Sequence, residues 1–331
     1  MSHASLPGIA IFGTGGTIAA TAASTTGLVD YTVTEGVNVL LAAVPQISQL
    51  ANLHQEQLFN VDSREFSNDM LVELATRINR VLSQADVAGA VVTHGTDTLE
   101  ETAYFLNLTV KSSKPVVVVG AMRPASAISA DGPLNLYNAI RLASHPSAGG
   151  RGVMVAMNDE IHAARFVSKA HTTQVDAFHS PGHGCLGQFN DERVYFLQSP
   201  GPLHTLHSEF TVPENATLPR VDIIYDHQDA GIHHYQASVA TGAQGIIVAG
   251  TGNGGLTPGA QRGVAHAKAH QLVCVRASRV GSGIVSPAAN DTVAGVVSAN
   301  SLNPQKARIL LMLALMRTCD PTIIQASFDR Y

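Results

Sequence analysis

The sequence has few of the residues that build metal sites or disulfide frameworks. Three cysteines occur among 331 residues, at positions 185, 274 and 319, and they form no CxxC motif. An odd number of cysteines without that spacing indicates neither a disulfide framework nor a zinc site. The fifteen histidines are scattered, and no HExxH motif occurs. We therefore expect a protein that uses no metal and no cofactor.

Basic clusters and long hydrophobic runs are also missing. The formal net charge is −5 and no run of Lys or Arg occurs, which argues against a nucleic-acid partner. The longest uninterrupted apolar stretch, 309–316, is far short of the ~18–20 residues of a membrane span, so no membrane partner is expected. The first residues, MSHASLPG, have no basic region followed by an apolar core. The expectation is a cytoplasmic protein, or a periplasmic one if a leader has been removed.

Three loops rich in Gly and Thr stand out, each after a short apolar run. Each run is bounded by Gly and rich in aliphatic residues, which predicts a buried strand. The runs are residues 9–12, 90–92 and 245–249, and the loops after them are 13–17, 94–98 and 250–255. Ligands of open parallel sheets bind beyond the carboxyl ends of the strands. Thr hydroxyls, an Asp and an Asn in these loops predict a site for a small polar substrate, with a Thr as nucleophile.

Strand-like runs alternate with helical patterns along the chain, which predicts βαβ units with helices on both faces of a parallel sheet. The length suits about two domains of ~100–200 residues each. The segment 199–219 contains four prolines and no clear period, so it predicts a linker. We expect a larger N-terminal α/β domain with a flavodoxin-like or Rossmann-like parallel sheet at 1–198, and a smaller C-terminal α/β domain at 220–331.

The expected elements follow from apolar spacing and capping residues. Ser67 or Asn68 and the pair Asn303-Pro304 are predicted to begin helices. The expected helices are 71–82, 99–110, 134–142 and 304–317, and the further expected strands are 116–119, 153–155, 221–225 and 272–275.

The first loop also invites a dinucleotide interpretation. Gly13 and Gly15 fit the first half of GxGxxG, but the third glycine position is Ile18. A GxxxxGK[ST] phosphate loop is missing as well. Nucleotide binding is therefore disfavoured.

Three residues are candidates on chemical grounds. Thr17 follows two glycines at a predicted strand end, where backbone N–H groups can hold an oxyanion, although a Thr there can also simply cap a helix. Asp97 either caps the next helix or holds a substrate ammonium. Lys169 is either a solvated surface charge or a general base toward a hydroxyl.

At these residues the chain resembles the bacterial type II L-asparaginases, including the glutaminase-asparaginases. The two family signatures stand as TGGTIA at 14–19 and THGTDT at 93–98. Further family-like stretches are EETAYF at 100–105, GAMRP at 120–124, SADGP at 129–133, MNDE at 157–160 and SLNPQKAR at 301–308. The resemblance covers nearly the whole chain and implies hydrolysis of an amino-acid side-chain amide to the acid and ammonia.

The resemblance also implies catalytic roles. Thr17 is the implied nucleophile, Tyr31 matches a Tyr on a mobile lid, and Thr96, Asp97 and Lys169 match a second catalytic cluster. Two assignments remain open. Either Tyr31 helps to activate Thr17 while Thr96 and Lys169 activate the water, or Lys169 works through Thr96 as the base throughout.

Substrate contacts carry over in the same way. Ser63 is implied to contact the α-carboxylate, Asp97 the α-ammonium, and the Ala121 carbonyl the side-chain amide. The oxyanion is implied to meet backbone N–H groups of the loops that contain Gly16 and Gly95. Asn253 is implied to come from a neighbouring subunit, which implies a homotetramer with intersubunit sites.

Two departures from the family pattern bear on these contacts. Arg64 follows Ser63 where the family has Gln or Glu, and an Arg cannot accept a hydrogen bond from an ammonium, so that contact is lost or passes to Glu65. Asn290 falls nearest the position of a family Glu from the neighbouring subunit, and Asp291 is the nearest carboxylate.

The departures motivate an alternative, a catalytically silent protein that binds asparagine or aspartate. A third reading is a related amidase that acts on misacylated transfer RNA, which the missing basic surface disfavours. Among amidohydrolase substrates, one methylene separates glutamine from asparagine and is worth only ~1–3 kcal/mol in an apolar pocket. A secondary glutaminase activity is therefore expected.

Overall fold

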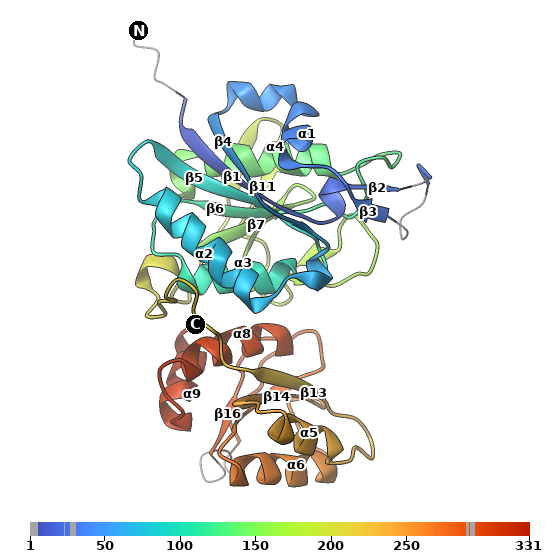
Figure 1. The fold of residues 1–331 in the computed structure, drawn as a ribbon, viewed down its shortest axis with the longest axis vertical. Helices are drawn as coiled ribbons and strands as arrows, with labels where there is room; N and C mark the ends of the chain where they lie inside the picture. The colour runs from blue at the N-terminus through green and yellow to red at the C-terminus, as the bar shows by residue number, and fades with distance from the viewer. Residues whose placement is uncertain (1–5, 23, 27–30, 289–290, 292–294) are drawn as a thin grey trace. The chain divides into compact units, whose positions relative to one another are not determined.

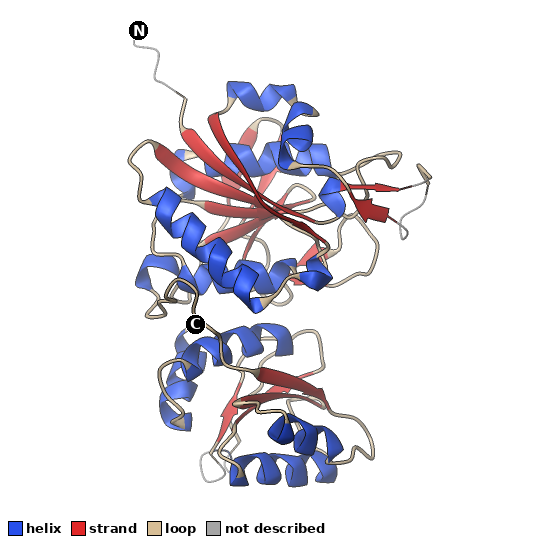
Figure 2. Ribbon diagram, viewed as in Figure 1, coloured by secondary structure: helices blue, strands red, loops and turns tan. Residues whose placement is uncertain are grey.

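A computed structural model describes residues 6–22, 24–26, 31–288, 291 and 295–331. The chain forms two compact units, Met1–Asn215 and Ala216–Tyr331, which are drawn in Figure 1 and, by secondary structure, in Figure 2. The division falls inside the segment 199–219. Each unit is an α/β structure, as the alternating pattern predicts.

The N-terminal unit is built on an eight-stranded sheet with the order β12-β11-β8-β7-β6-β5-β1-β4. Its strands are β1 (Gly8–Gly15), β4 (Asn52–Val61), β5 (Val87–Thr93), β6 (Val116–Val119), β7 (Val153–Met157), β8 (Glu160–Ala163), β11 (Gly187–Asn190) and β12 (Arg193–Phe196). The strands β4, β1, β5, β6 and β7 are parallel, and β8, β11 and β12 add antiparallel pairs at one edge. The parallel part has the flavodoxin-like order, whose switch point lies beside the first strand.

Helices cover both faces of this sheet (Figure 2). The helices α1 (Val37–Ala42) and α4 (Gly132–Ala143) lie on one face, and α2 (Asn68–Leu82) and α3 (Leu99–Thr109) lie on the other (Figure 1). The core under α1 and α4 takes alternate strand residues such as Ile9 and Ile11, because successive side chains of a strand point to opposite faces. The predicted cap is confirmed, since the Ser67 hydroxyl accepts from the Met70 N–H at 3.2 Å.

Two short ribbons complete the N-terminal unit. The strands β2 (Ala20–Ala22) and β3 (Tyr31–Val33) pair antiparallel directly after the first Gly-rich loop. The strands β9 (Ser168–Lys169) and β10 (Phe178–His179) form the second ribbon.

The segment 199–219 is more than a spacer. It contains no strand and only one short 3-10 turn, Thr205–His207. However, the side chains of Thr205, Ser208 and Phe210 are buried, and the Lys111 ammonium donates to the Ser208 carbonyl at 2.6 Å. Residues 199–215 belong to the N-terminal unit, and removing the Phe210 ring from water stabilises the folded segment.

The C-terminal unit has a four-stranded sheet, parallel throughout, with the order β13-β14-β15-β16. The strands are β13 (Val221–Tyr225), β14 (Gly245–Gly250), β15 (Val273–Ser278) and β16 (Val296–Ser298), and the helices are α5 (His233–Ala240), α6 (Pro258–Ala269), α8 (Pro304–Leu315) and α9 (Pro321–Arg330). The cap at Asn303 is confirmed, because its side chain accepts from the Lys306 N–H at 3.0 Å. The helix ends at Leu315, two residues before the predicted end.

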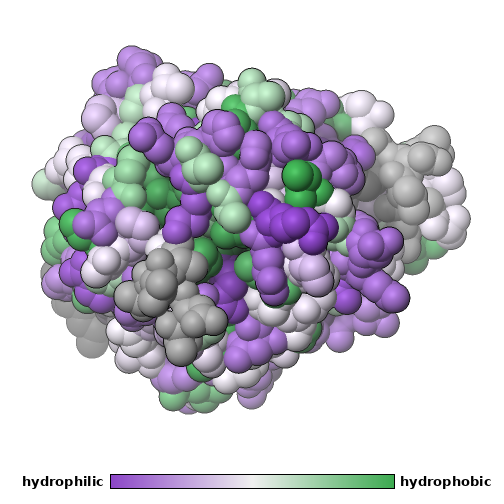
Figure 3. Space-filling model, turned by 90° about the horizontal axis from the view of Figure 1, so that it is seen from below, coloured by the Kyte–Doolittle hydropathy of each residue, from purple (hydrophilic) through white to green (hydrophobic). Residues whose placement is uncertain are grey.

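The face drawn in Figure 3 is mostly hydrophilic, with hydrophobic residues interspersed. No helix among the described residues is both long and apolar enough to cross a bilayer.

Candidate active site

The candidate site begins where the loops after β1 and β5 touch. These strands are neighbours in the sheet, so their carboxyl ends emerge side by side. Gly16 has φ 83°, and a Cβ placed on it would lie 2.2 Å from the Cα and N of Gly95. The left-handed backbone and the contact both require glycine at position 16. The two signature loops are therefore in direct backbone contact.

Thr17 follows this contact point and is buried. It opens a 3-10 turn, Thr17–Ala19, that leads into the β2–β3 ribbon. Tyr31 is the partner of Ala22 in this ribbon. The Tyr31 backbone is thus on the segment paired with the strand that follows Thr17, while its side chain lies outside the described part of the structure.

Ser63 approaches the same point from the end of β4. A Cβ on Gly95 would lie 2.7 Å from the Ser63 Cβ and Oγ. The Thr98 hydroxyl also donates to the Ser63 carbonyl at 2.8 Å. The strands β4, β1 and β5 are neighbours, and Ser63, Thr17 and Thr96 therefore lie together beyond their carboxyl ends.

The loop after β6 borders this group. Ala121 is fully buried, and a Cβ on Gly120 would lie 2.8 Å from the His94 carbonyl oxygen and 3.1 Å from the Thr96 methyl carbon. The Asn135 amide donates to the Gly120 carbonyl at 3.1 Å. Ala121 therefore directly follows a residue, Gly120, that packs against the loop carrying Thr96.

Lys169 reaches Thr96 and Asp97 across more than seventy residues of sequence. Its ammonium lies 3.0 Å from the Thr96 hydroxyl and 2.5 Å from the Asp97 carboxylate. The helix-cap interpretation of Asp97 is wrong, because the N-cap of α3 is Thr98 and makes no side-chain capping bond. The Asp97 carboxylate is instead paired with Lys169.

Glu100, to which the sequence reasoning assigned no role, helps to hold Lys169 in place. This residue of α3 is buried, and its carboxylate accepts from the Ser168 hydroxyl at 3.1 Å and from the Lys169 N–H at 3.3 Å. It anchors β9 to the helix that starts beside Asp97. An acidic residue in the first turn of a helix is usually explained by its favourable interaction with the helix dipole, so the sequence gave no reason to expect this contact.

Arg64 turns toward Asp62. Its Nε and Nη2 donate to the Asp62 carboxylate at 2.9 Å and 3.0 Å, and its side chain is 74% exposed. These hydrogen bonds hold the pKa of Asp62 below its ordinary value of 3.8, against the opposing effect of partial burial. Asp62 also accepts from the Arg64 N–H at 2.9 Å, which caps the turn Ser63–Glu65. Glu65 is exposed.

Asn253 and Asp291 belong to the C-terminal unit, where the nearly buried Arg276 links their segments. Its guanidinium donates to both Asp291 carboxylate oxygens and to the carbonyls of Asn253, Gly254 and Ser286. The Asn253 side-chain oxygen accepts from the Ser286 N–H at 2.9 Å. The Asp291 carboxylate is therefore engaged within its own unit. Asn290 lies outside the described residues.

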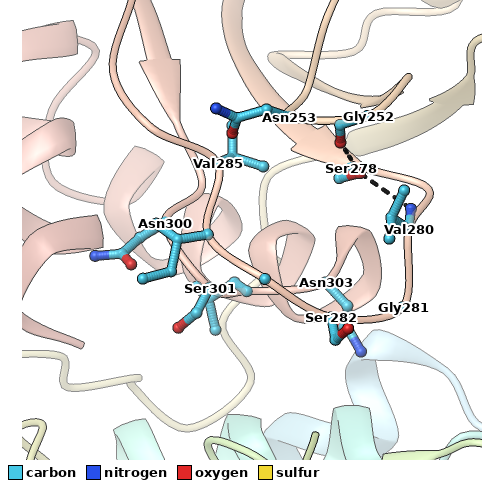
Figure 4. Close-up of a pocket in the computed structure, with 13 residues that line it drawn as sticks. Gly252, Asn253, Ser278, Val280, Gly281, Ser282, Val285, Asn300, Ser301 and Asn303 are labelled. Carbon is cyan, nitrogen blue, oxygen red and sulfur yellow. Dashed lines mark hydrogen bonds between the residues drawn. The ribbon is translucent and has the colours of Figure 1, made fainter. Parts of the chain in front are cut away.

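Asn253 also lines a pocket of the C-terminal unit (Figure 4). The Ser278 hydroxyl donates to the Gly252 carbonyl at 2.6 Å and accepts from the Val280 N–H at 3.0 Å. These two bonds fix the loop beside Asn253 to the end of β15.

Comparisons with known proteins identify the family of this chain. Residues 8–201 match the family model of the asparaginase N-terminal domain, and residues 220–328 match that of the glutaminase/asparaginase C-terminal domain. The chain belongs to the asparaginase family. The two loops that touch after β1 and β5 both lie within the N-terminal match.

Named relatives match nearly the whole asparaginase chain. L-asparaginase 2 of Bacillus subtilis is 49% identical over 327 residues, covering 98% of this chain and 87% of the relative. The glutaminase-asparaginase of Pseudomonas fluorescens biotype A is 41% identical over 330 residues, covering 98% and 91%. A crystal structure of a probable cytoplasmic L-asparaginase from Campylobacter jejuni has a TM-score of 0.96 at 46% identity, covering 98% of this chain and all of that one.

Proposed function

We propose that this protein hydrolyses L-asparagine to L-aspartate and ammonia, with L-glutamine as a secondary substrate. The observation that carries the proposal is the contact of Lys169 with Thr96 and Asp97. The loop that carries Thr96 and Asp97 is in backbone contact with the loop of Thr17. The relatives that match almost the whole chain are named for these two activities.

The reaction passes through an acyl-enzyme. The Thr17 hydroxyl oxygen bonds to the side-chain amide carbon, the carbonyl becomes an oxyanion, and its collapse expels ammonia, which has taken up the Thr17 proton. Water then attacks the ester and releases aspartate and the free hydroxyl. Lys169 lies within hydrogen-bond distance of Thr96, the reach that a proton-transfer partner needs, and both open assignments use this pair.

Substrate binding uses the groups around the two loops. Ser63 contacts the α-carboxylate and Asp97 the α-ammonium, so that only the side-chain amide is free to meet Thr17. The Ala121 carbonyl faces the amide, and the oxyanion meets backbone N–H groups of the loops that contain Gly16 and Gly95. Arg64 is paired with Asp62 beside the site, and Asp97 binds the substrate α-ammonium.

The functional assembly is a homotetramer whose sites lie between subunits. Asn253, and with it Asp291, reaches the substrate bound by a neighbouring copy. The contacts of Arg276 support this proposal, because they hold both segments together as one unit.

The decisive experiment measures ammonia release from L-asparagine and L-glutamine by the wild type, Thr17→Ala and Thr17→Ser. We expect the wild type to release ammonia, the Ser variant to retain part of this activity and the Ala variant to lose it, since only a hydroxyl can form the acyl-enzyme. Aspartate binding by calorimetry should persist in Thr17→Ala. A wild type that binds aspartate but releases no ammonia would instead be the silent binding protein.

A further inference from the structure

His94 is the first residue of the loop that carries Thr96, and its imidazole is buried. It is fully buried, follows the last residue of β5, and packs against the Phe66 ring at 4.7 Å between centroids. Its backbone N–H donates to the Val119 carbonyl at 2.8 Å. The residue is thus fixed by the sheet and by ring packing.

Both ring nitrogens have partners, and the partners define the tautomer. Nδ1 lies 2.8 Å from the Gly95 carbonyl oxygen, and Nε2 lies 3.0 Å from the Thr102 hydroxyl of α3. A carbonyl can only accept, so Nδ1 carries the proton and Nε2 accepts from the hydroxyl. Burial lowers the pKa of His94 to about 4, which keeps the ring neutral.

The bond to the Gly95 carbonyl has a consequence on the other side of the peptide. In a planar trans peptide the C=O of one residue and the N–H of the next point in opposite directions. The Gly95 carbonyl points to the buried ring, so the Thr96 N–H points away from it. Among the described residues this N–H has no hydrogen-bond partner, since the contact of Thr96 is made by its hydroxyl.

We propose that His94 is a positioning residue. By holding the Gly95 carbonyl inward it presents the Thr96 N–H to the oxyanion that forms when Thr17 attacks the amide. This inference rests on the proposed function. Donors fixed in advance cost no reorganisation as charge develops, which is why a peptide held from behind is an effective oxyanion donor. Thr102 acts one step further out, because its hydroxyl fixes the tautomer that can hold the carbonyl.

Thr102 gives the sharpest test because its variants keep the imidazole in place. Thr102→Val preserves volume but removes the hydroxyl, and Thr102→Ser restores the hydroxyl. Thr109→Val is the matched control, since this buried hydroxyl lies two turns further along α3 and bonds only to the Phe105 carbonyl at 2.8 Å. Each variant is assayed for kcat, KM and Tm on L-asparagine, together with His94→Ala.

Loss of one oxyanion donor lowers kcat by about 10²–10³-fold, so we expect a loss near the lower end for His94→Ala and roughly tenfold for Thr102→Val. KM should change little, and Thr102→Ser and Thr109→Val should keep kcat near wild type. The inference is overturned if the wild type is active and folded Thr102→Val keeps full kcat, or if Thr109→Val loses as much.

Nitrogen NMR of the imidazole adds a readout that needs no turnover. The expected signal is a neutral ring protonated at Nδ1 down to about pH 5, and the Nε2–H tautomer would refute the inference directly. An inactive wild type would overturn the proposed function instead, which keeps the two failures apart.

Discussion

Lys169 connects the two polar residues of the β5 loop, since its ammonium reaches both the Thr96 hydroxyl and the Asp97 carboxylate. Taken by itself, each residue looked ordinary, as a loop Thr, a possible cap and a surface Lys, and only the resemblance to the family grouped the three as one cluster. Their meeting depends on how β9 folds back onto α3, through a buried Glu100 contact that no local pattern encodes. The residue types at strand ends were therefore predictable from the sequence pattern, whereas their grouping was predictable from the resemblance alone and not from spacing.

Replacing Lys169 tests this cluster. A positioned proton-transfer group contributes ~10²–10⁴-fold in rate, so Lys169→Met should lower kcat on asparagine by at least about 100-fold while the protein stays folded. Lys111→Met is the matched control, because this partly buried lysine bonds to the Ser208 carbonyl away from the β5 loop. Equal losses in both variants would show that the effect is structural.

At the scale of elements, the periodicity predicted central strands and helices of both sheets, but it gave no indication of β4, β8, β11, β12, β16, α1 or α9. The strands at 116–119 and 221–225 match β6 and β13 residue for residue, and both runs are rich in the β-branched residues that strands favour. The end of α8 and the packing of 199–219 were missed. Both depend on tertiary burial, which overrides local propensity.

The anchoring of β9 by α3 gives a prediction at this scale. Glu100→Leu removes the acceptor for the Lys169 N–H, and an unsatisfied buried donor costs ~1–3 kcal/mol. We expect a lower Tm together with a lower kcat, because Lys169 loses its fixed position. Glu100→Gln keeps a carbonyl oxygen and should recover most of both. Thermal melts and steady-state kinetics on the two variants decide the matter, and an unaffected Leu variant would contradict this role of Glu100.

For the whole molecule, the residues proposed to form the site lie in both units of the chain. The N-terminal unit carries the Thr17 and Thr96 loops, and the C-terminal unit carries Asn253 and Asp291. The fold class and two-domain organisation were readable from the alternating pattern. The way in which copies of the chain associate depends on complementary surfaces, and no periodic pattern in a single sequence predicts such surfaces.

Mixed oligomers test the intersubunit proposal. Thr17→Ala and Asn253→Ala each damage one half of a shared site, so each should be nearly inactive alone. Co-expressed subunits that pair at random in a symmetric oligomer should regain about a quarter of the wild-type sites, those combining an intact Thr17 with a neighbour's intact Asn253. Ammonia release by the purified mixture is the measurement. No recovery in assembled mixtures would place Asn253 in the same subunit's site, and an Asn253→Ala variant that is active alone would place it outside any site.

The contact between Gly16 and Gly95 also limits how this protein can vary. Every missense change of a glycine codon introduces a residue with a Cβ, and at position 16 that atom would overlap the Gly95 backbone. No alternative amino acid is therefore available there by single-nucleotide mutation. A variant library aimed at new substrates should leave both codons untouched and place its diversity at exposed neighbours such as Arg64.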